Sequence, residues 1–465
     1  MNKDIEQALV NFRLSAGRYA KTERYYDGNH DLAFATEKFQ NTFGTLFREF
    51  ALNLCPVICD ALRDKLRVTG FGVEDAGVVS SQQSAVRSRN SGNSVDSVTS
   101  ATRLIWQRNR MGTRAGEVHK EALKNGDAYA IVWPNTRGEA VIYPNKAANI
   151  SVVYDDDCPG SIIRAAKYWR TADKYIRLNL FYSDRIEKYI SRAASEGALP
   201  DANGFQPFGS RFKVQSSKLG PDSSTLNLEL GTLNSDSVIL NPYGVVPVFH
   251  FANNADIGMP GRSELDAAIP VQDGLNKSVL DMLVAMEFSA YRQRWAAGIE
   301  IEYDAAGKAI APFTAGVDHL WIADNPNARF GDFDTAQLDQ FLKVKDSFRV
   351  DIASITGTPL HYLLQTTGGV PSGESLKKAE TRFIAKARDR QDSFGQVWSD
   401  VMAFALAVEG RGRDTRLLTE WEDPAAVSER EVLENILLKK QIGLPVEQAL
   451  IEAGYGEADV KKMVA

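Results

Sequence analysis

The chain has 465 residues, of which 44% are hydrophobic and 25% are charged, the balance of a folded globular protein. That composition excludes global disorder and a collagen-like fibre, and no apolar run approaches the roughly 18 residues that span a bilayer. The formal net charge of −6 argues against a broad basic surface for nucleic acid. Three cysteines are too few for a disulfide framework, and the N-terminus lacks an apolar signal, so we expect a reducing compartment without export.

The first 262 residues alternate between helical and extended patterns. Apolar residues recur every three or four positions in three stretches, which predicts helices over 3–20, 51–66 and 101–125. Between the last two, residues 76–100 are rich in Ser, Asn and Gln and predict a mobile surface loop. From Asp127 to about Ile190 the pattern predicts β-strands that begin with a hairpin.

The second half is dominated by longer helices. They are predicted over 271–297, 334–355 and 374–409, and the last would be about 54 Å long at 1.5 Å per residue. A Gly-punctuated, β-like stretch at 298–333 separates the first two. Residues 357–373 contain no Asp, Glu, Lys or Arg, and three short helices are expected after residue 410.

Motifs of catalysis are missing from the sequence. There is no GxxxxGK[ST] phosphate loop, no GxGxxG after a strand, no HExxH and no GxSxG. Cys55 and Cys59 have CxxxC spacing, but no second Cys or His pair lies nearby, so core packing is the better interpretation. Asp155–Asp157 precede Pro159-Gly160, which is more typical of a solvated turn than of a metal site. We therefore expect no catalytic residue, no metal and no cofactor.

Several short motifs occur in a distinctive order. They are Tyr25-Tyr-Asp-Gly28, Trp106-Gln-Arg-Asn109, Ala122-Leu-Lys-Asn-Gly-Asp-Ala-Tyr129, Asn241-Pro-Tyr-Gly-Val-Val-Pro247, Gly261-Arg-Ser-Glu-Leu265, Gln272-Asp-Gly-Leu-Asn276, Thr356-Gly-Thr-Pro359 and Ser372-Gly-Glu-Ser-Leu-Lys-Lys-Ala-Glu380. Together with the order of the helices and strands, this series closely resembles the portal proteins of tailed double-stranded-DNA phages, of the siphophage type.

The resemblance implies an α+β portal-protein fold and a ring of about twelve subunits around a DNA channel. The parts would be an α+β wing, a two-helix stem, a small β-containing clip, a tunnel loop, a long wing-spanning helix and a short helical crown. Their expected bounds are 1–262 for the wing, 263–297 and 334–356 for the stem helices, 298–333 for the clip, 357–373 for the tunnel loop, 374–409 for the long helix and 410–465 for the crown.

The uncharged stretch matches the tunnel loop of that family. Each phosphate that a Lys or Arg neutralises adds sequence-independent affinity, so an uncharged wall lets a duplex slide. The polar residues expected to touch DNA through weak, exchangeable hydrogen bonds are His361, Tyr362, Gln365, Thr366 and Thr367. The expected hinges are Gly357, Gly368, Gly369 and Gly373. The alternative is a buried connector, because Leu360, Leu363 and Leu364 need burial.

The clip is predicted to be acidic. Residues 263–356, which include it, carry 8 basic and 15 acidic side chains. The acidic residues expected to dock partners are Glu300, Glu302, Asp304, Asp318, Asp324 and Asp332, against Lys308 and Arg329. Exposed acids repeated around a ring would steer basic partners, although a rim that is merely soluble is the alternative.

The function that the resemblance implies is a DNA conduit at one capsid vertex, used for entry during packaging and exit during ejection. Implied partners are double-stranded DNA, the terminase large subunit, a head–tail adaptor, and the major capsid and scaffolding proteins, with no membrane. The location would be the virion, and the host cytoplasm during assembly. Two alternatives stay open: a nuclease or other processing enzyme of the packaging machinery, and another minor head structural protein.

Overall fold

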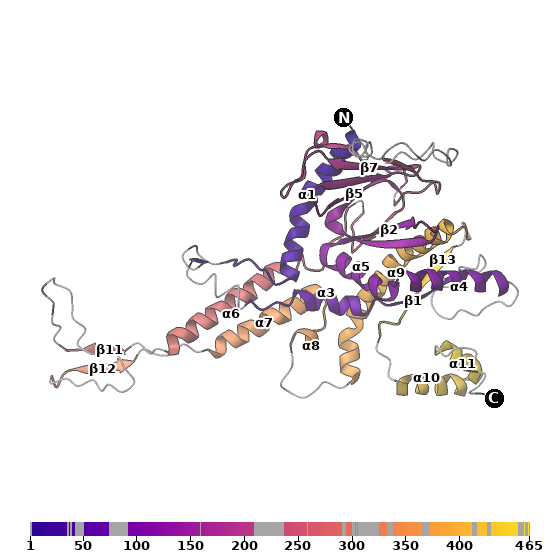
Figure 1. Ribbon diagram of the computed structural model, residues 1–465. Helices are drawn as coiled ribbons and strands as arrows, with labels where there is room; N and C mark the ends of the chain where they lie inside the picture. Colours follow the sequence, from indigo (N-terminus) through magenta and orange to yellow (C-terminus); the bar gives the residue numbers. More distant parts are fainter. Residues whose placement is uncertain are drawn as a thin grey trace. The chain divides into compact units, whose positions relative to one another are not determined.

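The computed structural model describes residues 2–34, 37, 40–41, 51–73, 92–158, 160–208, 237–257, 259–290, 294–299, 303, 305, 325–332, 338–364, 373–411, 416–425, 429–453, 460 and 464. Contacts divide the chain into two compact units (Figure 1). The first comprises Met1–Asn29, Asn53–Ile269 and Ala353–Ala465, and the second comprises His30–Leu52 and Pro270–Ile352.

A three-stranded antiparallel sheet lies at the centre of the first unit. Its strand order is β10 (Val248–Ala252), β2 (Asp127–Pro134) and β3 (Ala140–Lys146). The β2–β3 hairpin confirms the sequence prediction. Helix α5 (Met111–Asn125) runs directly into β2, and its C-terminal turn is fully buried, as is nearly all of β2. The sheet therefore forms the core onto which the other elements of this unit pack.

A six-stranded antiparallel sheet forms the second layer. Its strands are β4 (Ile150–Tyr154), β5 (Ile162–Arg170), β6 (Ile176–Phe181), β7 (Arg185–Ser191), β8 (Phe205–Pro207) and β9 (Val238–Leu240). Helix α1 (Lys3–Tyr26) covers one face, where Leu9 and Phe12 pack against Leu178 and Leu180. On the other face, Ala165 and other apolar residues pack against the three-stranded sheet.

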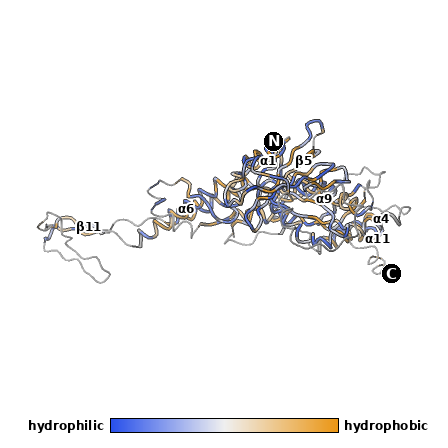
Figure 2. Tube along the Cα trace, turned by 45° about the horizontal axis from the view of Figure 1, so that its top comes forward, coloured by the Kyte–Doolittle hydropathy of each residue, from blue (hydrophilic) through white to orange (hydrophobic). Residues whose placement is uncertain are grey.

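Helix α9 (Gly373–Val408) is the longest element, with 36 residues, and hydrophobic stretches follow it in Figure 2. Its Trp398 is fully buried and donates a 2.8 Å hydrogen bond from Nε1 to Nε2 of His119. Burial lowers the pKa of His119 to about 3, so this histidine is neutral at pH 7. Beside α9, strand β13 (Leu417–Trp421) pairs with β1 (Val68–Val73).

The structure describes five further α-helices in this unit, of 4 to 17 residues. They are α3 (Cys55–Asp64), α4 (Gly92–Arg108), α8 (Leu360–Leu363), α10 (Glu429–Gln441) and α11 (Val446–Glu452). Gly443, just after α10, has a φ of +97°, as expected for a glycine that ends a helix.

The second unit contains the two predicted stem helices, α6 (Ile269–Ala290) and α7 (Asp339–Thr356). They pack together closely enough that a Cβ atom on Gly274 would lie 3.0 Å from the ring of Phe348. Strands β11 (Arg294–Ala297) and β12 (Arg329–Asp332) form an antiparallel ladder. At the cross-strand pair Trp295–Gly331, the indole occupies the space that a side chain at residue 331 would fill.

Several predicted boundaries are wrong. Helix α4 begins at Gly92, inside the predicted loop 76–100, and α1 continues to Tyr26 instead of stopping near residue 20. Helix α6 ends at Ala290, and β11 follows where a helix to residue 297 was predicted. Strands β8 and β13 were not predicted at all. In the part of the chain that the structure describes, no helix combines the length and hydropathy needed to cross a bilayer.

Candidate functional site

Two of the motifs in the sequence meet at a pair of glycines. Gly126 and Gly261 touch through their backbones: a Cβ atom on Gly261 would lie 1.9 Å from the carbonyl oxygen of Gly126. Gly126 has a φ of +90°, and its carbonyl accepts a 2.7 Å hydrogen bond from the N–H of Asn253. The motif at 122–129 and the motif at 261–265 are therefore parts of one junction.

Asp127 is the polar centre of this junction and is fully buried. Its carboxylate accepts hydrogen bonds from the hydroxyl of Tyr19 (2.7 Å), Nε2 of His250 (2.8 Å), the N–H of Gly261 (2.8 Å) and the guanidinium of Arg18. Burial alone would raise the pKa of Asp127, but the bonds from His250, Tyr19 and Gly261 outweigh it and hold the pKa below its ordinary value. The charged carboxylate thus ties α1, β10 and the Gly261 segment to β2.

Glu264 makes a second buried connection, to helix α9. Its carboxylate pairs with Arg390, at 3.3 Å, and with Lys386. Arg390 also donates from Nε to the side chain of Asn253, and Lys386 donates a 2.9 Å bond to the carbonyl of Thr356 at the end of α7. These contacts join the 253–264 segment and the end of α7 to α9.

In the second unit, the motif on α6 holds the segment that follows residue 29. Gln272 donates a 2.7 Å bond to the carbonyl of Leu52, and Nδ2 of Asn276 lies 2.6 Å from Nδ1 of His30. Both α6 side chains are buried. The motif at 272–276 therefore anchors this segment to the stem helix.

Helices α6 and α7 expose apolar side chains. From Asp339 to Val350, α7 has no buried side chain, and Leu342, Val344 and Val350 are each about 45% exposed. At 100° per residue, Leu342 and Val350 lie on one flank of the helix, and Val344 on the other. Met286 near the end of α6 is exposed as well.

The predicted tunnel loop is divided by the structure. Its first part, through residue 364, is packed: Thr358 and Leu363 are buried, and Leu360–Leu363 form helix α8. Nε2 of His361 lies 3.2 Å from Oε1 of Glu380, and the Tyr362 hydroxyl donates a 3.0 Å bond to the same oxygen. Burial and this carboxylate raise the pKa of Tyr362 to about 12. Both side chains bind Glu380 on α9, which favours the buried-connector alternative for residues 357–364.

Of residues 365–373, the rest of the predicted loop, only Gly373 is described. Gln365, Thr366, Thr367, Gly368 and Gly369 lie outside the described residues. Gly357 has a φ of +69°, a conformation that favours glycine, and Gly373 is the first residue of α9. The hinge role of these glycines stays a prediction.

The acidic clip residues also lie outside the described part. Glu300, Glu302, Asp304, Asp318 and Asp324 are among them, as is Lys308, and of Asp332 only the backbone is described. Arg329 is exposed on β12. Docking by this surface stays a prediction.

Other candidate residues behave as ordinary structural groups. Oδ1 of Asp155 accepts a 2.9 Å bond from the N–H of Asp157, which confirms a turn. Cys55 and Cys59 are fully buried, and burial raises the thiol pKa of Cys59. Within the described ranges, no group of three or more His, Cys, Asp or Glu residues is placed to hold a metal ion.

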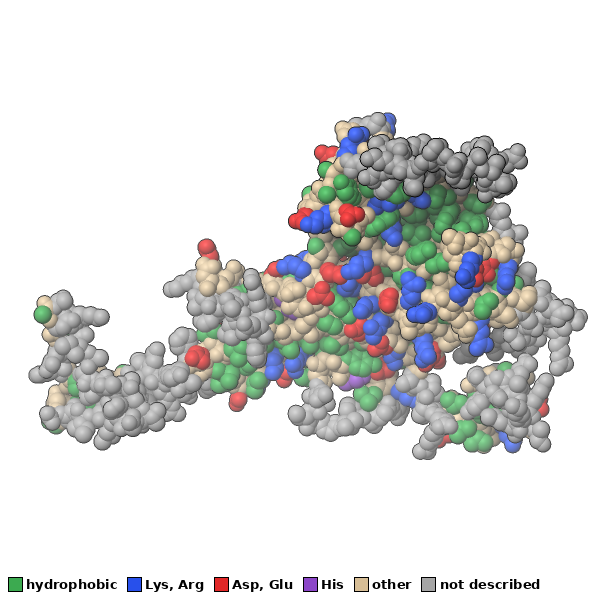
Figure 3. All heavy atoms as spheres, in the orientation of Figure 1, with side chains coloured by type: hydrophobic (Ala, Val, Ile, Leu, Met, Phe, Trp, Pro, Cys, Tyr) green, Lys and Arg blue, Asp and Glu red, His purple; other side chains and the backbone are tan. Residues whose placement is uncertain are grey.

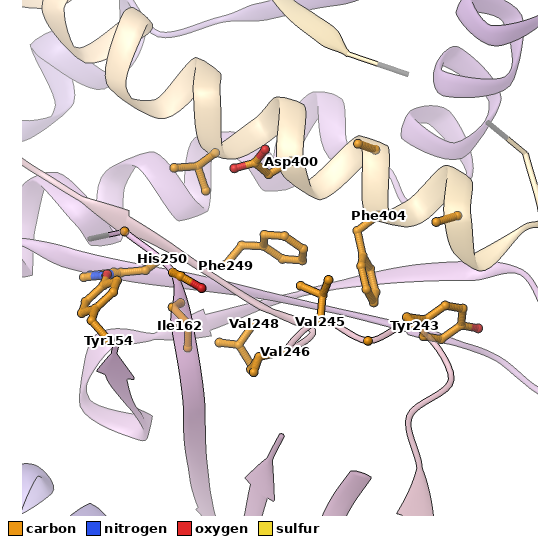
Figure 4. Close-up of a pocket in the computed structure, with 16 residues that line it drawn as sticks. Tyr154, Ile162, Tyr243, Val245, Val246, Val248, Phe249, His250, Asp400 and Phe404 are labelled. Atoms are coloured by element: carbon orange, nitrogen blue, oxygen red, sulfur yellow. The ribbon is translucent and has the colours of Figure 1, made fainter. Parts of the chain in front are cut away.

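A groove of about 640 Å³ lies between α9 and the 241–250 segment of the first unit (Figure 4). Its wall includes Val245, Phe249 and Tyr154, and Figure 4 shows Phe404 pointing into it from α9, with Asp400 on the same helix. Partial burial raises the pKa of Asp400 above its ordinary value. The space-filling view shows a broad hydrophobic area, in green, on one face of this unit (Figure 3).

Comparison with known proteins assigns the sequence to a family. A sequence profile described as "Phage portal protein, SPP1 Gp6-like" matches residues 71–464. The chain belongs to this family of phage portal proteins. The match includes both stem helices, the Gly126–Gly261 junction and all of α9. The family predicted from the sequence is confirmed.

Portal proteins are also the curated relatives that match. The portal protein of Mycobacterium phage L5 is 26% identical over 234 residues, which is 47% of this chain and 48% of that protein. That of Mycobacterium phage D29 is 25% identical over the same shares. The match thus spans about half the length of these relatives. A solved structure titled "Neck of empty GTA particle computed with C6 symmetry" covers 86% of this chain and 88% of its own, at 12% identity and a TM-score of 0.45.

Sequence reasoning missed the partners that hold the portal motifs together. Glu380 was the last residue of a quoted motif, yet its bonds to His361 and Tyr362 could not be read from spacing. Asp127 and Glu264 also lay in quoted motifs. A charged residue inside an otherwise apolar strand, such as Asp127 at the start of β2, was the available signal for a buried polar junction.

Proposed function

We propose that this chain is the subunit of a closed portal ring at one vertex of a tailed phage capsid. The ring forms the channel through which double-stranded DNA enters during packaging and leaves during ejection. It also docks the terminase large subunit and, later, a head–tail adaptor. The subunit itself performs no chemistry in this role. Its location is the virion, and the host cytoplasm during assembly.

The observation that carries this proposal is the uncovered stem. A family match alone does not require a ring, but both flanks of α7 expose aliphatic side chains, which supports a neighbour on each side. The apolar surface of a helix is stable when another element buries it. A closed ring of identical subunits supplies one neighbour for each flank.

The charge distribution supports the channel. Residues 263–356 have almost twice as many acidic as basic side chains, and residues 357–373 have neither. A wall of this kind gives passing phosphates few cations to pair with, so a duplex is not trapped by counterion release. Because α8 is packed against α9, the DNA-facing part of the tunnel loop would be 365–372, with Gln365, Thr366 and Thr367.

The clip is proposed as the docking surface. Its acids, Glu300 and Glu302 among them, would attract basic surfaces of the terminase and then of the adaptor, with salt-sensitive encounter rates. The wing, residues 1–262, is proposed to contact the major capsid and scaffolding proteins.

Negative-stain electron microscopy and native mass spectrometry of the purified chain test the proposal. We expect rings with a central hole and a single subunit number. A chain that stays monomeric over a wide range of protein and salt concentrations would contradict it, as would shells or filaments, which fit another head protein.

A further inference from the structure

The groove beside α9 places one carboxylate next to aliphatic and aromatic side chains. Val245 is 52% exposed, and Phe249 and Phe404 lie along the same groove. Asp400 is its only acidic lining residue, and no ion pair of Asp400 occurs among the described residues, while His250, which also lines the groove, is already bonded to Asp127. An occupant that fits this groove would therefore carry a row of aliphatic side chains and, at one end of that row, a cation to pair with Asp400.

Helix α1 has such a line on its outer face. Val10, Leu14, Gly17 and Lys21 are spaced by four, three and four residues, so they form one ridge. Val10 is 46% exposed and Leu14 is 78% exposed, although both lie inside a helix that buries its opposite face. No atom lies within 4 Å of the position that a side chain of Gly17 would take. Lys21 is exposed; its ammonium lies 6.0 Å from the centre of the Tyr25 ring, and no ion pair of Lys21 occurs among the described residues.

The aliphatic and charged positions have the same spacing on the two helices. Leu14 and Lys21 are seven residues apart, as are Ala407 and Asp400 on the groove side of α9. Each interval is about 10 Å of helix. If α1 lies antiparallel to α9, Lys21 reaches Asp400 while Leu14 meets Ala407. The small residues Gly17, Ala403 and Ala407 let two helices approach closely.

We propose that the α1 ridge of one subunit docks in the α9 groove of the next subunit of the ring. This inference rests on the proposed function and specifies which surfaces of the wing join. The two surfaces belong to the same unit but to different elements, so the contact is head-to-tail, the type that closes into rings.

A disulfide between subunits tests the contact directly. In a Cys158→Ser background, which removes the exposed native thiol, Leu14→Cys and Ala407→Cys are combined. Mild oxidation should give a ladder of covalent oligomers on a non-reducing gel, whereas each single variant should give none beyond a dimer. The matched control combines Leu14→Cys with Leu418→Cys, an exposed position on β13 outside the groove, and should give no ladder.

A charge exchange provides an independent test. Asp400→Lys and Lys21→Asp should each raise the protein concentration needed for half-assembly by about tenfold, because like charges then meet at every interface. The double variant should recover most of the loss, and Arg137→Asp, on an exposed turn, should have no effect.

The outcomes separate the inference from the proposed function. Wild-type rings without the specific ladder, or charge variants that assemble normally, would overturn the α1–α9 contact and leave the ring intact. A wild-type chain that forms no rings would overturn the proposed function itself. A specific ladder from the Leu14→Cys and Ala407→Cys pair, together with recovery of assembly in the double charge variant, would support both.

Discussion

Gly126 and Gly261 lie so close that neither position has room for a methyl group directed at the other. The carbonyl of Gly126 would be 1.9 Å from a Cβ on Gly261, and the carbonyl of Gly261 would be 2.4 Å from a Cβ on Gly126. Backbone atoms cannot move aside as a flexible side chain can. This contact fixes the path of the chain from β10 to the first stem helix.

Gly261→Ala should therefore lower the free energy of unfolding by about 3 kcal/mol or more, through steric strain at the junction. The matched control is Gly112→Ala in helix α5, where a Cβ would meet nothing within 4 Å. Alanine there should stabilise the protein by about 0.5–1 kcal/mol, because it favours the helix. Chemical denaturation monitored by tryptophan fluorescence measures both. Equal effects of the two variants would contradict the steric explanation.

Glu23 predicts a specific pH dependence of stability. Burial opposes its ionisation, but hydrogen bonds from Lys124 and Lys146 outweigh that effect and lower its pKa from 4.5 to about 2. A carboxyl whose pKa falls on folding stabilises the native state above its unfolded pKa, and that contribution is lost as pH falls toward 2. Because the side chain is one-third exposed, we expect about 1–2 kcal/mol at pH 7.

Glu23→Gln should thus lower the melting temperature at pH 7 and have little effect near pH 2.5. Thermal unfolding of both proteins across this range gives the comparison. Arg13–Asp201 is a useful control, because both partners are well exposed and Asp201→Asn should change little at any pH. A deficit of Glu23→Gln that stays constant down to pH 2.5 would contradict the low pKa.

The exposed flank of α7 predicts an assembly defect larger than the folding defect. Leu342 and Val350 are each 45% exposed in the subunit, and replacing both by Ser removes the exposed part together with the covered part. The melting temperature of the monomer should fall modestly, while the concentration needed for ring formation should rise by tenfold or more, about 1.4 kcal/mol per interface. Lys343→Ser, on the same helix, is the control and should assemble normally. Analytical ultracentrifugation measures the shift.

A positive charge in the tunnel loop should stall DNA. Gln365, which lies outside the described residues, is the second residue after the packed helix α8. Gln365→Lys would add one cation per subunit, and the summed attraction for phosphates would slow sliding. We expect normal rings, slow packaging in an in-vitro assay, and relief as salt rises. Gln365→Asp should be milder, and the reverse order would show that residues 357–373 serve only as a connector.

Long periodic segments were the best predicted part of the fold. The 374–409 helix agrees with α9 within one residue at each end, because apolar residues from Phe383 to Val408 keep one face buried for many turns. The β2–β3 hairpin was equally clear. Local pattern decides such elements, since each residue's preference agrees with its burial.

Elements decided by distant partners were mispredicted. Arg294–Ala297 reads as a continuation of α6, yet it pairs with Arg329–Asp332, more than thirty residues later. β13 pairs with β1, which precedes it by more than 340 residues. No hairpin pattern close to β13 in the sequence therefore indicates a strand there. The site followed the same rule: the motifs were visible, but the contact of Tyr362 with Glu380 was not. Sequence periodicity contains no information on which surfaces meet.

The amine of Lys386 connects the end of α7 with the segment after β10. It bonds the carbonyl of Thr356, the last residue of α7, and pairs with Glu264, while its own helix continues to the buried Trp398. A helix is stiff along its axis, so a pull or twist on the end of α7 passes through this polar contact into a rod 36 residues long. Such a load would thus reach the aromatic core around His119 and Trp398, where tight packing resists it.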